Sequence, residues 1–214
     1  MLSMIKAVLF DLDQTLINFM KMKSESCKSA LDAMVKNGLK IDKKIGIKKL
    51  MDTYLRFGIE SDIAFTKFLE EQTGKADEKI LQAGIDAYLK TKPNFLKPYP
   101  YVLEILEYLK SLNVKLGIVT DAPKTKATHR MKAINIIHFF DFIITFDDTG
   151  EKKPSNRPFK LAMEKLNLHP EEILFVGDSM TRDIRPAKKL GMKVLRIRRA
   201  EDLKKIKEFF NNSS

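Results

Sequence analysis

The sequence predicts an α/β fold, in which a doubly wound parallel sheet carries an inserted helical domain. Three observations lead to this prediction. Short apolar segments of strand length recur along the chain, amphipathic helical patterns separate the later ones, and a long helical stretch follows the first. Strands that alternate with helices form a parallel sheet covered on both faces. Ligands of such sheets bind just beyond the carboxyl ends of the strands.

The first predicted strand is Lys6–Phe10, an apolar run that stops at the polar residue Asp11. Comparable strands are expected at Val114–Val119, Phe142–Phe146, Ile173–Val176 and Val194–Ile197. Between them, apolar residues recur at the i, i+3, i+4, i+7 spacing of a helix that buries one face. Two such stripes are Val102, Ile105, Leu106 and Leu109, and Phe159, Ala162, Met163 and Leu166.

The long stretch between the first strand and the second lacks a convincing strand and is mostly helical. Its apolar stripes are Cys27, Ala30, Leu31, Met34 and Val35; Phe65, Phe68 and Leu69; and Leu81, Ile85, Tyr88 and Leu89. A crossover to a parallel neighbour needs little more than a dozen residues, so this stretch exceeds one. We therefore predict a helical domain at 17–94, inserted into an α/β domain made of 1–16 and 95–214. Its return linker is expected from Lys92 to Pro100, where prolines gather.

The composition is that of a chain with a packed core, since 44% of the 214 residues are hydrophobic. No apolar run approaches the roughly 18 residues that a membrane helix needs, so we expect no membrane span. We also expect no secretory signal. Cys27 is the only cysteine, so no internal disulfide can form, as is typical of a cytoplasmic protein. Nothing in the sequence indicates the oligomeric state.

Much of the formal net charge of +11 lies late in the chain. Between Arg182 and Lys207, eleven Lys or Arg residues stand against three acidic ones. Such a run attracts anions, either a phosphorylated metabolite or nucleic acid, or it is a solvated surface. Lysine outnumbers arginine in the chain and no aromatic residue interleaves with this run, which favours the solvated surface. These features argue against nucleic acid as a partner.

Polar residues that can carry chemistry follow the predicted strands. Asp11 and Asp13 come directly after the first strand, and two acids at this spacing can share one site if the backbone turns. Thr120 and Asp121 follow the second strand, where a hydroxyl and backbone N–H groups can hold phosphate oxygens or cap a helix. Lys153, in the loop after the third strand, can supply a point charge for a phosphate. None of these signals is specific alone.

The fourth strand is followed by Gly177, Asp178 and, five residues later, Asp183. If the sheet brings these loops together, four carboxylates converge: Asp11, Asp13, Asp178 and Asp183. Each pair of like charges about 4 Å apart repels by several kcal/mol at an effective dielectric near 20. The cluster therefore needs a cation, and oxygen ligands suit Mg²⁺, which substrate phosphate and water usually complete.

These four elements, in this order, resemble the haloacid dehalogenase superfamily, in the branch that inserts a helical cap after its first motif. The resemblance covers nearly the whole chain and implies a Rossmann-like core. The matching segments are Asp11-x-Asp13-x-Thr15, Thr120, Gly150-Glu151-Lys152-Lys153-Pro154 with Phe159, and Gly177-Asp178-Ser179-x-x-x-Asp183-Ile184. Their combination is specific, whereas each piece alone is not.

The resemblance implies a magnesium-dependent phosphatase that works through a phosphorylated aspartate. Asp11 would be the nucleophile, and Asp13 the general acid and then the general base. The implied metal ligands are Asp11, Asp13 through its backbone carbonyl, Asp178 and, in support, Asp183. The implied phosphate-binding residues are Thr120, Asp121 and Lys153. Lys153 is preferred over Lys152 because of its spacing and the proline that follows it.

Other functions stay open at this point. A phosphomutase or another phosphotransferase of the superfamily would retain all four motifs, whereas a dehalogenase would normally lack the carboxylate of Asp13. A basic nucleic-acid-binding protein with a vestigial site is the alternative from a different class. The presence of every implied catalytic residue favours a phosphatase of a small phosphorylated metabolite, which the cap would enclose. Candidate cap contacts are Asn18, Tyr54 and Arg56.

Overall fold

The computed structural model describes residues 4–211 and divides into two compact units, each described here by itself. The first unit combines Met1–Asn18 with Lys97–Ser214, and the second is Phe19–Leu96. Both boundaries fall two residues after those drawn from the sequence. The reason is a bridge between the two connecting segments. Ile17 pairs antiparallel with Pro98, and the Tyr99 N–H donates to the Leu16 carbonyl at 2.8 Å, which ties these residues to the first unit.

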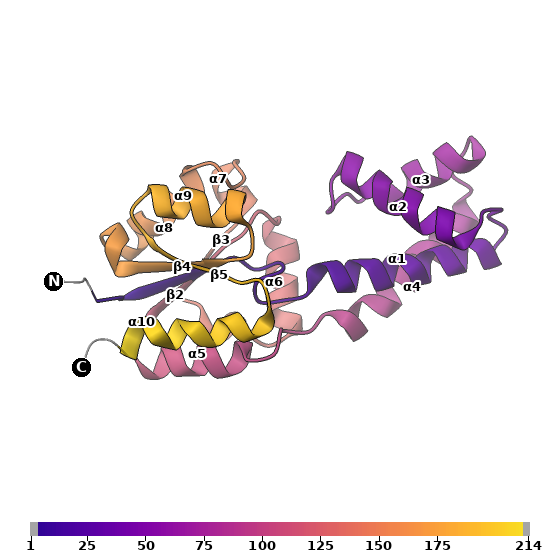
Figure 1. Ribbon diagram of the computed structural model, residues 1–214. Helices are drawn as coiled ribbons and strands as arrows, with labels where there is room; N and C mark the ends of the chain where they lie inside the picture. Colours follow the sequence, from indigo (N-terminus) through magenta and orange to yellow (C-terminus); the bar gives the residue numbers. More distant parts are fainter. Residues whose placement is uncertain (1–3, 212–214) are drawn as a thin grey trace. The chain divides into compact units, whose positions relative to one another are not determined.

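The first unit is built on a five-stranded sheet in which every pair of neighbouring strands is parallel (Figure 1). The strands are β1 (Ala7–Phe10), β2 (Lys115–Val119), β3 (Phe142–Ile144), β4 (Ile173–Gly177) and β5 (Lys193–Arg196). Their order in the sheet is β3-β2-β1-β4-β5. The predicted fold class is confirmed. β1 is central, and Phe10 at its end pairs with Ile118 on one side and Val176 on the other.

Helices cover both faces of this sheet, with α8 and α9 on one face and α5 and α10 on the other (Figure 1). The α-helices of the unit are α5 (Val102–Ser111), α6 (Lys124–Ala133), α7 (Phe146–Thr149), α8 (Arg157–Leu166), α9 (Arg185–Lys189) and α10 (Glu208–Asn211). The other helical segments are the 3-10 helices η1 (Ile137–Phe139), η2 (Pro170–Glu172) and η4 (Ala200–Lys207) and the π-helical η3 (Met180–Ile184). Every residue of β1 is buried, because successive side chains point to opposite covered faces.

The third strand is shorter than predicted. It ends at Ile144 instead of Phe146, because Thr145 starts the short helix α7. The backbone N–H and the hydroxyl of Thr145 both donate to the Asp148 carboxylate, at 2.8 and 2.6 Å. This local bonding satisfies polar groups at the start of α7 and competes with continuation of the strand.

The second unit consists of four helices: α1 (Phe19–Lys36), α2 (Lys43–Phe57), α3 (Ala64–Thr73) and α4 (Glu78–Phe95). α1 packs mainly on α4, and the approach is close at one point. A Cβ atom on Gly84 of α4 would lie 2.2 Å from the Met34 Cε atom of α1. The core of the unit contains buried residues from α1, α2 and α3, together with Leu39: Cys27, Ala30, Leu31, Met34, Leu39, Leu50, Tyr54, Ala64, Phe65, Phe68 and Leu69.

The end of α4 corrects the predicted linker. We expected the return linker to begin at Lys92, but α4 continues to Phe95 with Pro93 inside it. Pro93 lacks the N–H that would reach the Leu89 carbonyl one turn earlier. Leu89 is exposed, so water can satisfy that carbonyl, and the Leu96 N–H donates to Lys92 at 3.1 Å to close the last turn. Within the described residues, no helix combines the length and the apolar composition that crossing a membrane requires.

Candidate active site

The carboxyl ends of the central strands place Asp11 and Asp178 at the same edge of the sheet. The Asp11 N–H donates to the Val176 carbonyl at 2.9 Å, so the pairing of β1 with β4 extends one residue past the strand. Just past the end of β4, the Asp178 carbonyl accepts a hydrogen bond from the Arg196 Nε atom of β5 at 2.9 Å, which fixes the backbone there. The Asp11 carboxylate is buried, and the Thr15 hydroxyl donates to its Oδ2 atom at 3.2 Å.

Lys153 is the cation at the centre of the site. Its Nζ atom lies 2.6 Å from Asp11 Oδ1 and 2.7 Å from Asp183 Oδ1, and it donates to the Val119 carbonyl at 2.9 Å. The side chain is only 2% exposed. Its backbone N–H donates to Asp121 Oδ1 at 2.8 Å, which anchors the loop that carries it. The lysine chosen from the sequence therefore contacts the acid that we expected to be the nucleophile.

Three carboxylates gather on this edge: Asp11, Asp178 and Asp183 each offer an oxygen atom within 4.8 Å of the others. Asp183 reaches the group because β4 ends in a glycine. A Cβ atom on Gly177 would lie 2.6 Å from the Asp183 Cβ atom, so only glycine leaves room for this close approach. The Ser179 N–H holds Asp183 Oδ2 at 2.9 Å. The π-helical turn η3 thus brings Asp183 back toward the end of β4, where Asp178 lies.

The charge balance of this group favours binding of a cation. Burial raises the pKa of Asp11 to about 7, and Asp183 adds to the rise although Lys153 opposes it. Burial and Asp183 also raise the pKa of Asp178. Burial alone would lower the pKa of Lys153, but Asp11 and Asp183 outweigh it and raise that pKa. One buried ammonium therefore does not neutralise three carboxylates.

The donor set fits a hard divalent cation. All three groups offer carboxylate oxygens, which suit Mg²⁺ better than a softer metal. The Asp178 Oδ1 atom is buried and has no hydrogen-bond partner among the described residues. A buried carboxylate oxygen without a partner carries a desolvation cost that a cation would remove.

Asp13 lies in the same loop but its side chain is placed differently. Its Oδ2 atom lies 2.7 Å from the Arg130 Nη1 atom on α6, and Asp13 does not belong to the group of three acids. The loop turns at Gln14, whose φ is 65°, and closes through a hydrogen bond from the Gln14 N–H to the Ile17 carbonyl at 2.7 Å. The loop that carries Asp11 and Asp13 therefore contains a backbone turn, which these two acids need if they are to act in one site.

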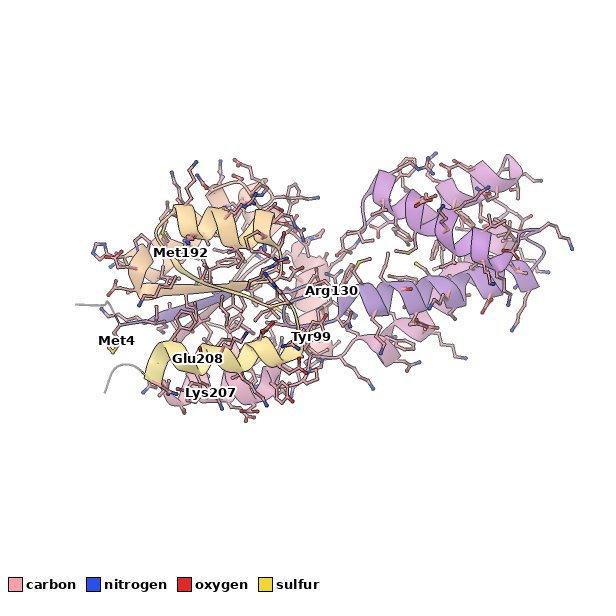
Figure 2. The ribbon with its side chains drawn as sticks, in the orientation of Figure 1. Met4, Tyr99, Arg130, Met192, Lys207 and Glu208 are labelled. Atoms are coloured by element: carbon pink, nitrogen blue, oxygen red, sulfur yellow. The ribbon has the colours of Figure 1, made fainter. Side chains whose placement is uncertain are left out.

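Sequence reasoning missed Arg130, labelled in Figure 2, although the sequence contains a signal for it. Ala127, Arg130, Met131 and Ile134 repeat at the i, i+3, i+4, i+7 spacing of a buried helical face. An arginine in such an apolar stripe needs a buried partner. Its partner here is separated from it by 117 residues in the chain, so the pairing itself could not be read from spacing.

Thr120 and Asp121 follow β2 as predicted. The Thr120 N–H donates to the Ile144 carbonyl at 2.9 Å, and its hydroxyl oxygen accepts the Ala122 N–H at 3.2 Å. The Asp121 carboxylate accepts from Lys153 and lies 3.4 Å from Arg182. A phosphate contact by Asp121 would therefore come from its backbone N–H, because its carboxylate accepts the Lys153 backbone N–H, lies beside Arg182 and would repel an anion.

Two of the residues predicted to contact substrate, Tyr54 and Arg56, lie in the helical unit and differ in burial. Tyr54 is buried in that unit's core, beneath the Lys23 ammonium, which lies 3.4 Å from the centre of its ring. Little of Tyr54 is left for a ligand. Arg56 is exposed and pairs with Glu71 at 2.6 Å.

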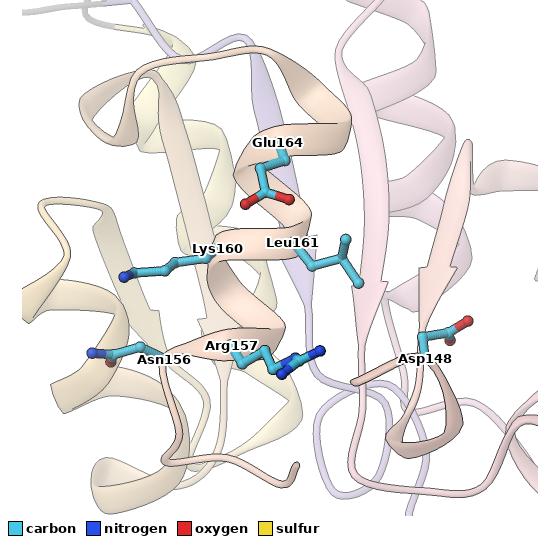
Figure 3. Close-up of a pocket in the computed structure, with 6 residues that line it drawn as sticks. All are labelled: Asp148, Asn156, Arg157, Lys160, Leu161 and Glu164. Atoms are coloured by element: carbon cyan, nitrogen blue, oxygen red, sulfur yellow. The ribbon is translucent and has the colours of Figure 1, made fainter. Parts of the chain in front are cut away.

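A surface cavity of about 470 Å³ lies beside α8, away from the acidic group. Its lining residues, drawn in Figure 3, are Asp148, Asn156, Arg157, Lys160, Leu161 and Glu164. The lining mixes charges of both signs, and Asp148 already bonds the start of α7. This cavity contains none of the residues that the sequence predicted for catalysis.

Comparisons with known proteins agree with this geometry. The sequence profile of haloacid dehalogenase-like hydrolases matches residues 8–197. The chain is 36% identical to a glyceraldehyde 3-phosphate phosphatase of Methanocaldococcus jannaschii over 91% of its length and 85% of the relative's. It is 31% identical to a phosphoglycolate phosphatase of Aquifex aeolicus, over 88% of this chain and 82% of that one.

A solved structure agrees as well. A haloacid dehalogenase-type phosphatase of Thermococcus onnurineus superposes with a TM-score of 0.68 at 28% identity, covering 91% of this chain and 87% of that one. One protein family accounts for the sheet order, the group of acids and these similarities. The chain belongs to the haloacid dehalogenase-like hydrolases, and it is a phosphatase of that family.

Proposed function

We propose that this phosphatase hydrolyses small phosphate monoesters with Mg²⁺, through an aspartyl-phosphate formed on Asp11. One observation carries the proposal: Asp11 is buried at the end of the central strand, in contact with a buried lysine and within reach of two further carboxylates. A nucleophilic carboxylate, a fixed cation and an acidic metal site are the parts that phosphoryl transfer needs, because its catalysis is mainly positioning and charge neutralisation.

The first half-reaction transfers the phosphoryl group to the protein. A carboxylate oxygen of Asp11 forms a bond to phosphorus while the bond from phosphorus to the ester oxygen breaks. Asp13 gives a proton to that leaving oxygen, which departs as an alcohol. Lys153 and the Thr120 hydroxyl bind the phosphoryl oxygens, together with backbone N–H groups at the end of β2 such as that of Asp121.

The second half-reaction releases phosphate. Asp13, now ionised, takes a proton from a water molecule whose oxygen attacks phosphorus. The bond between phosphorus and Asp11 breaks, so that inorganic phosphate leaves and the Asp11 carboxylate is restored. Asp13 ends protonated, as it began, and each turnover therefore consumes one water molecule for each ester.

The metal would be held by Asp11, Asp178 and the backbone carbonyl of Asp13, with Asp183 in support. The Oδ1 atoms of Asp178 and Asp183 are both buried and make no hydrogen bond within the described residues, but that of Asp183 lies 2.7 Å from the Lys153 ammonium, and its Oδ2 accepts the Ser179 N–H. When bound, the cation supplies positive charge to the nucleophile and to the phosphoryl oxygens. Lys153 would share this task, because it contacts Asp11 directly.

The helical unit, drawn from the sequence as 17–94, would serve as a cap that encloses a small substrate and excludes water. The names of the relatives above describe phosphatases of small phosphorylated compounds, which supports a phosphorylated metabolite as the substrate class. Their names differ from one another, so they do not choose one metabolite. The single cysteine, Cys27, is buried in that unit and agrees with a cytoplasmic location.

A panel of phosphorylated sugars, glycolytic intermediates, nucleotides and pyrophosphate, assayed with Mg²⁺ and with chelator, tests the proposal. Activity should disappear after chelation and return when Mg²⁺ is added. The Asp11→Asn variant should neither turn over nor take up label from ³²P-substrate, and Asp13→Asn should lose about 10²–10⁴-fold in turnover. Full activity after thorough chelation, or covalent labelling of Asp11→Asn, would contradict the assignment.

A further inference from the structure

Arg130 is the largest of the fully buried side chains that the structure describes, with 2% of it exposed. It lies on α6, whereas the carboxylate that it meets belongs to the loop after β1. The Nη1 atom of Arg130 and the Oδ2 atom of Asp13 are 2.7 Å apart, and Asp13 is 23% exposed. The guanidinium thus contacts the carboxylate from the interior, and the second carboxylate oxygen of Asp13, Oδ1, is buried as well.

Burying a guanidinium is expensive, because it loses its hydration and regains it only through well-aligned partners. If the residue served only stability, an apolar side chain would do so without the desolvation cost of a charge, because the neighbouring Ala127 and Met131 on α6 are fully buried. One contact joins the two groups, from Nη1 to Oδ2, and the planar guanidinium fixes the direction from which it reaches the carboxylate, as the flexible ammonium of a lysine would not. The placement therefore indicates that the direction of the Asp13 carboxylate is what Arg130 controls.

We propose that Arg130 is a positioning residue, which fixes the orientation of the Asp13 carboxylate for transfer of the proton to and from the reacting oxygen. The inference rests on the role proposed for Asp13 as general acid and base. Misplacing such a group by about 1 Å can cost about 10²-fold in rate. Loss of Arg130 should therefore weaken the steps that use this proton and leave the others intact.

The test compares two phosphate monoesters that differ in their need for that proton. The leaving oxygen of an alkyl ester such as glycerol phosphate needs a proton, whereas that of 2,4-dinitrophenyl phosphate does not. The measured quantity is kcat/KM, which covers only the steps up to formation of the aspartyl-phosphate. The ratio of the two kcat/KM values on one enzyme sample does not depend on how much of the sample is folded.

Arg130→Met should lower kcat/KM for the alkyl ester at least about tenfold more than for the dinitrophenyl ester. Arg130→Lys keeps the charge but lacks the planar guanidinium, so its loss of kcat/KM for the alkyl ester relative to the dinitrophenyl ester should lie between those of wild type and Arg130→Met. This variant also provides the test if Arg130→Met fails to fold. The exposed Lys132 lies on the same helix, and Lys132→Met should leave the ratio unchanged. In an Asp13→Asn background, Arg130→Met should not change the ratio further.

Equal losses for the two esters in both Arg130 variants would overturn the inference, because a structural or phosphate-binding residue affects both alike. This failure differs from a failure of the proposed function. If Asp13→Asn itself leaves the ratio unchanged, the proton-transfer role of Asp13 is wrong. If Asp13→Asn shifts the ratio and the Arg130 variants do not, only the positioning role of Arg130 is wrong.

Discussion

Replacing Asp11 by asparagine tests the charge balance of the site without a substrate. Burial raises the pKa of Asp11 to about 7, and the neighbouring Asp183 adds to this effect even though Lys153 lies 2.6 Å away. In the unfolded chain the same carboxyl returns to its ordinary value of 3.8, so the folded state binds this proton more tightly. The stability that this proton contributes is complete below about pH 4 and is lost as the pH rises to about 7.

The size of the effect follows from the pKa values. Each unit by which a pKa is raised costs the folded state about 1.4 kcal/mol once the group is ionised. Raising Asp11 from 3.8 to about 7 therefore costs about 4 kcal/mol at pH 8, and less than half of that at pH 5. Asparagine has nearly the same shape and does not ionise. Relative to wild type, the free energy of unfolding of Asp11→Asn should rise by about 2–3 kcal/mol between pH 5 and pH 8.

Urea unfolding in the presence of chelator, followed by circular dichroism because the chain has no tryptophan, measures this difference. Groups elsewhere titrate alike in both proteins and cancel in the comparison. The lost hydrogen bond to Lys153 adds a penalty at both pH values and does not change the slope. Glu107→Gln, which removes an exposed carboxylate on α5, is the matched control. A difference between Asp11→Asn and wild type that stays constant or shrinks as the pH rises would refute the reasoning.

Three further predictions concern the same site and its substrate. Gly177→Ala should cost about 1–3 kcal/mol and weaken Mg²⁺ binding in calorimetry, because its Cβ would lie 2.6 Å from that of Asp183; unchanged affinity would contradict this. Lys153→Met should cost about 3–5 kcal/mol at pH 8 but less at pH 5, where Asp11 is protonated; equal unfolding losses at both pH values would disagree. Small monoesters should exceed 5′- or 3′-phosphorylated oligonucleotides in kcat/KM at near-physiological salt; a tenfold advantage for an oligonucleotide would exclude a size-selective cap.

The strands of the sheet could be predicted closely because their residues are buried on both faces and therefore apolar throughout. β1 and β4 differ from the predicted segments by a single residue. The gathering of Asp11, Asp178 and Asp183 follows from the same fact, because the ends of neighbouring parallel strands meet at one edge. The predicted end of β3 was wrong because of a local hydrogen bond: the Thr145 hydroxyl donates to Asp148, and the strand ends early.

Two other features could not be predicted from the sequence pattern. Pro93 usually marks the end of a helix, but near the exposed end of α4 it removes only one hydrogen bond. Four carboxylates were expected to converge, with Asp13 reaching the metal through its backbone carbonyl; the Asp13 side chain lies outside the group of three acids and meets Arg130 of α6. Spacing in the sequence predicts which residues reach the edge of the sheet. It does not predict the direction of a side chain that a distant helix determines.

The charges of the site also imply an order of binding, if the proposed function holds. The chain carries a net charge of +11, which attracts phosphorylated substrates from a distance. At the reacting position, however, the carboxylates of Asp11, Asp178 and Asp183 outnumber the ammonium of Lys153. A phosphate dianion approaching these groups would be repelled, since like charges about 4 Å apart cost several kcal/mol at an effective dielectric near 20. We therefore expect a divalent cation to bind before the substrate, or together with it, and the buried Oδ1 atom of Asp178 would be among its ligands.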